Sequence, residues 1–266
     1  MSENGILLEV NNLEVIYNRA ALAIQGVSFK VPQHSIVAIL GVNGAGKTTT
    51  LRAVSGFLPS EDAEISDGRV TFEDELLNGK PPHVIARRGI ILIPERVKTF
   101  VTLTVEENLL ASVAASASSK IGMKAVFEYF PVLKERHSQV AGYLSGGERQ
   151  MLAIASALLC SPKLLMVDEL TLGLAPVVIN HLMEIIKKLN EELGITIVLV
   201  EQNAMAALQV ASHGYIMESG RVVYEGSKEA LMAQEDVREF YLGLGGEQLA
   251  SYRDVKQYRR VRRWWA

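Results

Sequence analysis

Short uninterrupted apolar runs and longer stretches with helical spacing alternate along the chain. A short apolar run between turn residues is typical of a strand buried on both faces of a parallel sheet. Such runs lie at residues 35–40, 89–94, 163–169 and 195–202. Helical spacing is found over about 103–143 and 176–193. Because buried strands alternate with helices, the pattern predicts an α/β fold with a mostly parallel core sheet.

Strict alternation of apolar and polar residues predicts antiparallel strands elsewhere in the chain. The alternation covers residues 7–29 and 68–74, and residues 214–226 have the pattern of a hairpin with a Ser-Gly turn. Thr104 and Glu107 have the spacing of a capping box, so we expect a helix to begin there.

Composition narrows the class of protein further. The chain has 266 residues, 48% of them hydrophobic, with a formal net charge of −3, which gives no global electrostatic case for nucleic acid. Cys160 is the single cysteine, so no intramolecular disulfide can form and a reducing compartment is expected. No apolar run has the ~20 residues of a membrane span, and the N-terminus lacks a signal pattern. We expect a soluble, cytoplasmic protein that can still sit against a membrane protein.

The segment GVNGAGKTT, residues 41–49, joins a predicted buried strand to a predicted helix. It matches the phosphate-loop pattern G-x-x-x-x-G-K-[ST], in which backbone N–H groups and a helix N-terminus bind phosphate. Lys47 is expected to reach the β- and γ-phosphates of a nucleotide, and Thr48 to bind Mg²⁺. The alternative is a flexible glycine-rich turn. The predicted nucleotide-binding residues of the loop are Gly41, Asn43, Gly44, Ala45, Gly46, Lys47, Thr48 and Thr49.

Two adjacent acids end the buried run at residues 163–169. In a phosphate-loop NTPase, the terminal aspartate of a second strand helps to hold Mg²⁺, which is the role expected for Asp168. The alternative is a helix-capping acid at a strand–helix junction. Glu169 is then available to orient and deprotonate an attacking water.

A third motif, LSGGERQ at residues 144–150, lies about twenty residues before Asp168. Ser-Gly-Gly alone is a weak signal, but between a phosphate loop and an Asp-Glu strand it closely resembles the signature of ATP-binding-cassette (ABC) ATPases. The resemblance covers residues 6 to 243 or so. It implies a P-loop NTPase core, an antiparallel β subdomain and an inserted helical subdomain at about 100–155, all in one domain over residues 1–245.

The family resemblance implies roles for residues outside the phosphate loop. Tyr17 matches an aromatic that stacks on adenine, with an ordinary strand tyrosine as the alternative, and Glu95 matches a position that contacts Mg²⁺. Gln202 stands where most members have a histidine that contacts the γ-phosphate, and Glu169 would be the general base. Two such subunits sandwich two ATP molecules in this family. The signature residues expected to contact the ATP of the partner chain are Ser145, Gly146 and Gly147.

Several departures from the broad family point in one direction. Glu95 replaces a glutamine, GLAP follows the acid pair, and VEQNA replaces a Thr-His-Asp run. Together they resemble the shorter ATPase subunit of importers of branched-chain amino acids, urea, amides or aromatic acids. Leu170 is a separate departure, because proline usually follows the glutamate, and it predicts a less rigid turn.

The importer resemblance also implies partners and a location. We expect a second ATPase subunit (a heterodimer, or alternatively a homodimer), two transmembrane permeases and, indirectly, a periplasmic or surface solute-binding protein, with no nucleic acid. The chain would be peripheral, on the cytoplasmic face of the inner membrane. Competing functions are a soluble ABC ATPase of DNA repair or translation, and the ATPase of a lipid exporter.

The C-terminal segment 246–266 lies beyond the family pattern. Six basic residues and two acidic ones fall within 247–266, together with Trp264 and Trp265. The segment suits a contact with a membrane interface or a partner subunit. The alternative is a solvated tail.

Overall fold

The computed structural model describes residues 5–96, 99–115, 121–235 and 237. The C-terminal tail predicted at 246–266 lies outside the described residues. In the described part of the chain, no helix combines the length and apolar character needed to span a bilayer.

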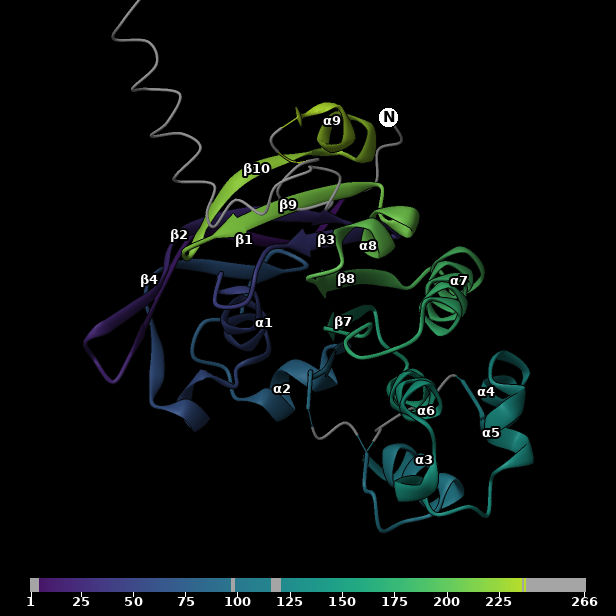
Figure 1. The fold of residues 1–266 in the computed structure, drawn as a ribbon. Helices are drawn as coiled ribbons and strands as arrows, with labels where there is room; N and C mark the ends of the chain where they lie inside the picture. The colour runs from purple at the N-terminus through teal and green to yellow at the C-terminus, as the bar shows by residue number, and fades with distance from the viewer. Residues whose placement is uncertain (1–4, 97–98, 116–120, 236, 238–266) are drawn as a thin grey trace, which may run out of the picture.

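A six-stranded sheet forms the centre of the molecule (Figure 1), in the strand order β10-β9-β3-β8-β7-β6. Five neighbouring strands are parallel, and β10 pairs antiparallel with β9 at one edge. The strands are β3 (Ile36–Leu40), β6 (Ile90–Ile93), β7 (Leu164–Asp168), β8 (Thr196–Glu201), β9 (His213–Glu218) and β10 (Arg221–Ser227). The four predicted buried strands are therefore confirmed as β3, β6, β7 and β8.

A second, four-stranded antiparallel sheet has the order β2-β1-β4-β5. Its strands are β1 (Ile6–Tyr17), β2 (Ala21–Pro32), β4 (Ala63–Phe72) and β5 (Glu75–Leu76). The α/β fold with a mostly parallel core and an antiparallel part is confirmed. Ser219 and Gly220 form the predicted turn between β9 and β10, both with positive φ, as a type I′ hairpin requires.

The helices gather on two sides of the central sheet. Between the sheets lie α1 (Lys47–Ser55), the short η1 (Leu58–Glu61) and α2 (Pro82–Arg87). The opposite side carries α7 (Pro176–Leu193), α8 (Ala204–Val210) and α9 (Lys228–Ala233). A further group lies at the lower right of Figure 1, consisting of α3 (Val105–Ala115), α4 (Met123–Tyr129), α5 (Pro131–Glu135), the turn η2 (Ala141–Tyr143) and α6 (Gly146–Leu159).

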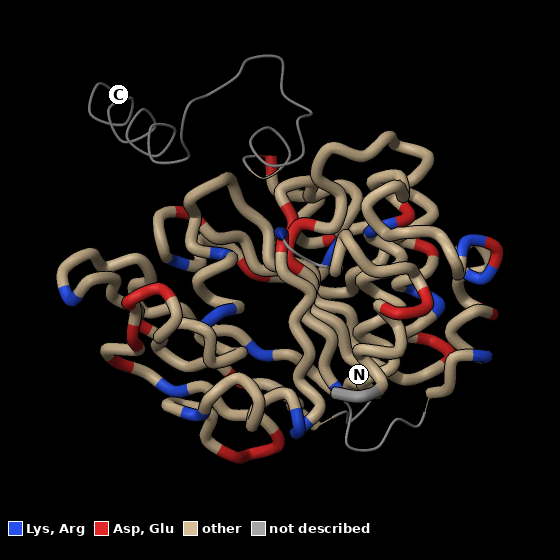
Figure 2. Tube along the Cα trace, turned by 90° about the horizontal axis from the view of Figure 1, so that it is seen from below, with Lys and Arg blue, Asp and Glu red and all other residues tan. Residues whose placement is uncertain are grey.

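Alternate residues of the central strands enter two different hydrophobic cores. Val37 and Ile39 of β3 pack with the antiparallel sheet and α1, whereas Ile36, Ala38 and Leu40 pack with the helices of the other face. Because both faces are covered, each strand is apolar at almost every position. Charged positions lie mostly along the outer helices and loops (Figure 2). The strands β3, β6, β7 and β8 contain two charged residues, Asp168 and Glu201, each the last residue of its strand.

Candidate functional site

Two glycines in the loop between β3 and α1 occupy positions where a Cβ would be strained, one through close backbone and the other through its positive φ. A Cβ on Gly41 would lie 2.4 Å from the carbonyl oxygen of Met217. Gly46 caps α1 with φ of +100°, and a Cβ there would lie 2.6 Å from Ile24 Cδ1. The residues from Gly46 to Thr49, which begin α1, line the cavity over this loop, so the free N–H groups of a helix start lie at its wall, as an anion site needs.

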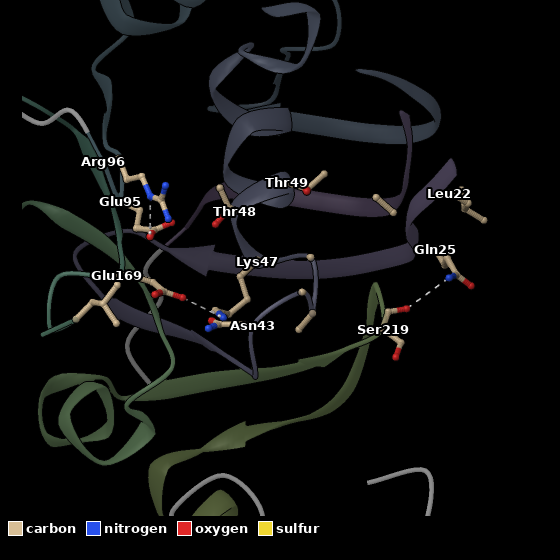
Figure 3. Close-up of a pocket in the computed structure, with 15 residues that line it drawn as sticks. Leu22, Gln25, Asn43, Lys47, Thr48, Thr49, Glu95, Arg96, Glu169 and Ser219 are labelled. Atoms are coloured by element: carbon tan, nitrogen blue, oxygen red, sulfur yellow. Dashed lines mark hydrogen bonds and ion pairs between the residues drawn. The ribbon is translucent and has the colours of Figure 1, made fainter. Parts of the chain in front are cut away.

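A cavity of about 690 Å³ opens over this loop, and Figure 3 shows the side chains that line it. Lys47 projects into the loop, where its ammonium donates to the carbonyl oxygens of Gly41 (2.8 Å) and Val42 (3.1 Å). Its Nζ also lies 3.3 Å from Glu169 Oε1, and both side chains are almost fully buried. The structure therefore brings two of the predicted residues, from α1 and from the end of β7, into direct contact.

Asp168 lies at the carboxyl end of β7, 2% exposed. Burial raises the pKa of Asp168 to about 6, while the hydrogen bond from Thr48 acts in the opposite direction and the nearby charge of Glu169 raises it further. Among the described residues, no group hydrogen-bonds Asp168 Oδ1. A buried carboxylate oxygen without a partner, beside a threonine hydroxyl, is a donor set that suits a hard divalent cation completed by phosphate and water.

Glu169 and Glu95 approach the same end of the cavity. Glu169 has φ of +47°, a left-handed conformation that is unusual for a residue with a Cβ. Its N–H donates to the carbonyl oxygen of Val200 on β8 at 2.9 Å. Glu95 follows β6 and its carboxylate lies 3.4 Å from Arg96 Nε. Figure 3 shows both glutamates at the opposite end of the cavity from Leu22 and Gln25.

Gln202 lines a smaller cavity of about 250 Å³ that adjoins the first. Glu169 lines both cavities, so the predicted general base and Gln202 share the lining of the smaller one. Glu201, immediately before Gln202, is 2% exposed and accepts hydrogen bonds from the backbone N–H and hydroxyl groups of the segment after Glu169. Sequence reasoning missed Glu201 because it reads as an ordinary strand residue.

The predicted signature residues lie away from this cavity, at the start of α6. Ser145 caps the helix in a full capping box, with its N–H donating to Glu148 Oε2 at 2.8 Å and its Oγ accepting from the Glu148 N–H at 3.3 Å. A Cβ on Gly147 would lie 2.5 Å from Val178 Cγ1. Within one chain, the structure does not bring Ser145, Gly146 or Gly147 to the phosphate loop.

Tyr17 ends β1, and the structure does not place it among the residues that line the large cavity. Its hydroxyl lies 3.2 Å from Thr49 Oγ1 and 3.4 Å from Glu61 Oε2. The stacking of Tyr17 on adenine stays a prediction.

Sequence reasoning missed four residues that line the large cavity at the end away from Glu95 and Glu169. They are Leu22, Ala23, Gln25 and Ser219. Gln25 and Ser219 are 194 positions apart, so no local motif could have joined them.

Comparison with known families gives a direct match. The family described as ABC transporter matches residues 24–172 of the chain, a range that includes the phosphate loop, the LSGGERQ segment and both acids. The chain belongs to the ABC transporter family, as one of its ATP-binding and ATP-hydrolysing cassettes.

Individual relatives cover nearly the whole chain. The chain is 41% identical over 239 residues to the high-affinity branched-chain amino acid transport ATP-binding protein BraG of Pseudomonas aeruginosa, covering 89% of this chain and all of that protein. It is 32% identical over 241 residues to the lipopolysaccharide export system ATP-binding protein LptB of Escherichia coli, covering 89% of this chain and 97% of LptB.

Solved structures agree on the fold. A nucleotide-free ATP-binding cassette from an ABC transporter matches with a TM-score of 0.77 at 26% identity, covering 88% of this chain and 98% of that one. An ATP-binding cassette in its ADP conformation matches with a TM-score of 0.75 at 27% identity, covering 90% and 99%.

Proposed function

We propose that this chain is the ATPase subunit of an importer that carries branched-chain amino acids or related small solutes across the cytoplasmic membrane. The observation that carries the proposal is the 41% identity to BraG, which extends over the full length of that relative. LptB, a lipopolysaccharide export protein, is similar over the same share of the chain but only 32% identical. The difference favours import of a small solute over lipid export.

The proposed partners are a second ATPase subunit and two membrane permeases, with a solute-binding protein outside. BraF, also of Pseudomonas aeruginosa and also a branched-chain amino acid transport ATP-binding protein, is 29% identical to this chain over 255 residues. Two similar but distinct ATPases in one organism support a heterodimer, with a homodimer as the alternative. The chain would lie on the cytoplasmic face of the membrane, and its contact with permeases would hold it there.

In this proposal, the loop from Gly41 to Thr49 binds the phosphates of ATP. Its backbone N–H groups and the start of α1 supply partial positive charge, and Lys47 supplies a full charge. Lys47 must exchange its present contacts with Glu169 and the loop carbonyls for phosphate oxygens. The adenine of ATP would lie toward Leu22, Gln25 and Ser219. Tyr17 would lie beside the adenine, as the family pattern leads us to expect.

Thr48 and Asp168 are the residues that would hold Mg²⁺, with Glu95 close by. The support is the partnerless Oδ1 of Asp168 beside the Thr48 side chain. When bound, Mg²⁺ would neutralise charge on the phosphates as the terminal group is transferred.

Glu169 is the proposed general base. A water oxygen forms a bond to the γ-phosphorus as the bond to the β,γ-bridging oxygen breaks, and the water proton passes to the Glu169 carboxylate. Gln202, across the adjoining cavity, can donate a hydrogen bond to the γ-phosphate but cannot titrate near neutral pH. Ser145, Gly146 and Gly147 would reach ATP bound to a partner subunit, through backbone N–H groups at the start of α6.

Co-purification from membranes tests this proposal. The tagged chain is recovered from solubilised membranes of its native host, and the associated subunits are identified by mass. Two permeases, a second ATPase and a solute-binding protein that binds leucine, isoleucine or valine would support it. Recovery alone, or with components of lipopolysaccharide export, DNA repair or the ribosome, would overturn it.

A further inference from the structure

Glu201 is a buried acid that neither the phosphate loop nor the predicted metal residues employ. It ends β8 in the middle of the central sheet, where its register partner on β3 is Leu40, the last residue before the phosphate loop. On the other side of β8, Val200 pairs with Asp168. Glu201 therefore lies between the two strand ends that carry the nucleotide-binding loop and the acid pair.

In the described part of the chain, the Glu201 side chain hydrogen-bonds the two residues that follow Glu169. Oε1 accepts from the N–H groups of Leu170 at 2.8 Å and Thr171 at 3.2 Å, and Oε2 accepts from the Thr171 hydroxyl at 2.7 Å. Leu170 and Thr171 are themselves buried. The contact with Leu170 uses its backbone N–H group, so a proline at position 170 would remove it.

Glu169, the residue just before the two that Glu201 binds, has a strained backbone conformation. Glu169 has φ of +47°, and a left-handed conformation in a residue with a Cβ persists only where its surroundings determine it. Val200 fixes the N–H of Glu169 on one side, and Glu201 fixes the next two residues on the other. Between these anchors, the Glu169 side chain points at Lys47 (Figure 3).

We propose that Glu201 is a positioning residue for Glu169, holding the backbone turn after it so that the Glu169 carboxylate stays at the phosphate loop. The inference rests on the proposed role of Glu169 as general base. Glu201 itself touches neither ATP nor the reacting water. It also precedes Gln202 directly, so the same contacts tie the acid pair to the strand end that carries Gln202.

The test compares Glu201→Ala with Glu201→Gln in the full-length chain. Alanine removes the acceptor of three hydrogen bonds, whereas glutamine keeps Oε1 for the two backbone N–H groups and lets the Thr171 hydroxyl turn to accept. We expect kcat for ATP hydrolysis to fall at least about tenfold in Glu201→Ala and within about threefold of wild type in Glu201→Gln, with the Kd for ATP within about threefold in both. In a Glu169→Gln background, Glu201→Ala should leave the Kd for ATP unchanged.

A second pair covers the case in which Glu201→Ala does not fold. Thr171→Val removes only the hydroxyl at constant shape, and Thr171→Ser keeps it. We expect a loss of kcat of about threefold or more in the valine variant, with near wild-type turnover in the serine variant. Unchanged kcat in Glu201→Ala or, if that variant does not fold, in Thr171→Val overturns the inference, as does a fall in ATP affinity that matches the fall in kcat.

Failure of the base assignment gives a different result. If Glu169→Gln hydrolyses ATP like wild type, the proposed chemistry of Glu169 is wrong, and the positioning role of Glu201 is wrong with it. If Glu169→Gln is inactive while Glu201→Ala turns over normally, only the role of Glu201 is wrong.

Discussion

Lys47 and Glu169 form an ion pair in which both side chains are almost fully buried. A buried charge without a partner is costly, so each of the two holds the other in place and restricts where it can lie. The loop carbonyls of Gly41 and Val42 add two acceptors to the same ammonium group. At the scale of single residues, these contacts fix the Lys47 ammonium between the loop and Glu169.

Glu169→Gln tests the chemistry of this pair. Because the amide cannot take a proton from water, we expect kcat for ATP hydrolysis to fall by about 10²- to 10⁴-fold, with the Kd for ATP within a few-fold. Steady-state phosphate release and equilibrium nucleotide binding measure the two quantities. Glu191→Gln, on the exposed face of α7, removes the same charge far from the site and serves as the control. Wild-type turnover in Glu169→Gln would contradict the assignment.

Glu201 gives a pH-dependent contribution to stability. Burial raises the pKa of Glu201 to about 7, although hydrogen bonds from Thr171 and Leu170 lower it, whereas an unfolded glutamate titrates near about 4.3. Between about pH 4.5 and 7, the folded chain holds a proton that the unfolded chain has released, so this group makes stability fall as pH rises. From pH 5 to pH 8, the urea midpoint of wild type should therefore fall relative to that of Glu201→Gln. An equal difference in both proteins would contradict the expectation.

Helix starts are the clearest local signals at the scale of elements. The capping box predicted from Thr104 and Glu107 is confirmed: the Glu107 N–H donates to Thr104 Oγ1 at 3.1 Å, and Glu107 Oε2 accepts from the Thr104 N–H at 2.7 Å. The helix predicted over residues 176–193 has those bounds as α7, with Pro176 in its first turn and Gly194 as a left-handed cap. Caps are visible in sequence because they depend on neighbours within four residues.

Removing the cap of α3 should cost stability without touching the site. Thr104→Ala leaves the Glu107 N–H in the first turn without its side-chain acceptor, so we expect the free energy of unfolding to fall by about 1 kcal/mol. Thr104→Ser keeps the hydroxyl and is the matched control. Urea denaturation measures both, and equal midpoints for the alanine variant and wild type would show that the box is not needed.

Contacts between distant elements were the part that sequence could not supply. The helical pattern over about 103–143 resolves into α3, α4, α5 and the turn η2 in the described residues, and Pro131 starts α5 directly after α4. Glu201 and Thr171 meet only because β7 and β8 are adjacent in a particular register. Periodicity locates each strand but does not fix its register against a neighbour far along the chain, so the motifs were predictable and the acid that holds them together was not.

At the scale of the whole molecule, the central sheet carries the phosphate loop, the acid pair and Gln202 on the ends of three adjacent strands, β3, β7 and β8. The carboxyl ends of parallel strands meet at one edge, which is why residues far apart in sequence line the same two adjoining cavities. Ser145 and the two following glycines face elsewhere in the single chain, so a complete site in the proposed mechanism needs a second subunit.

Uptake of radiolabelled leucine by the native host is the most direct measurement of the proposed function. In cells lacking this chain, initial uptake at low leucine concentration should be lost, restored by the wild-type chain and not restored by Glu169→Gln expressed to the same level. That result would tie ATP hydrolysis by this subunit to import. Unchanged uptake in its absence, or full restoration by Glu169→Gln, would contradict the account.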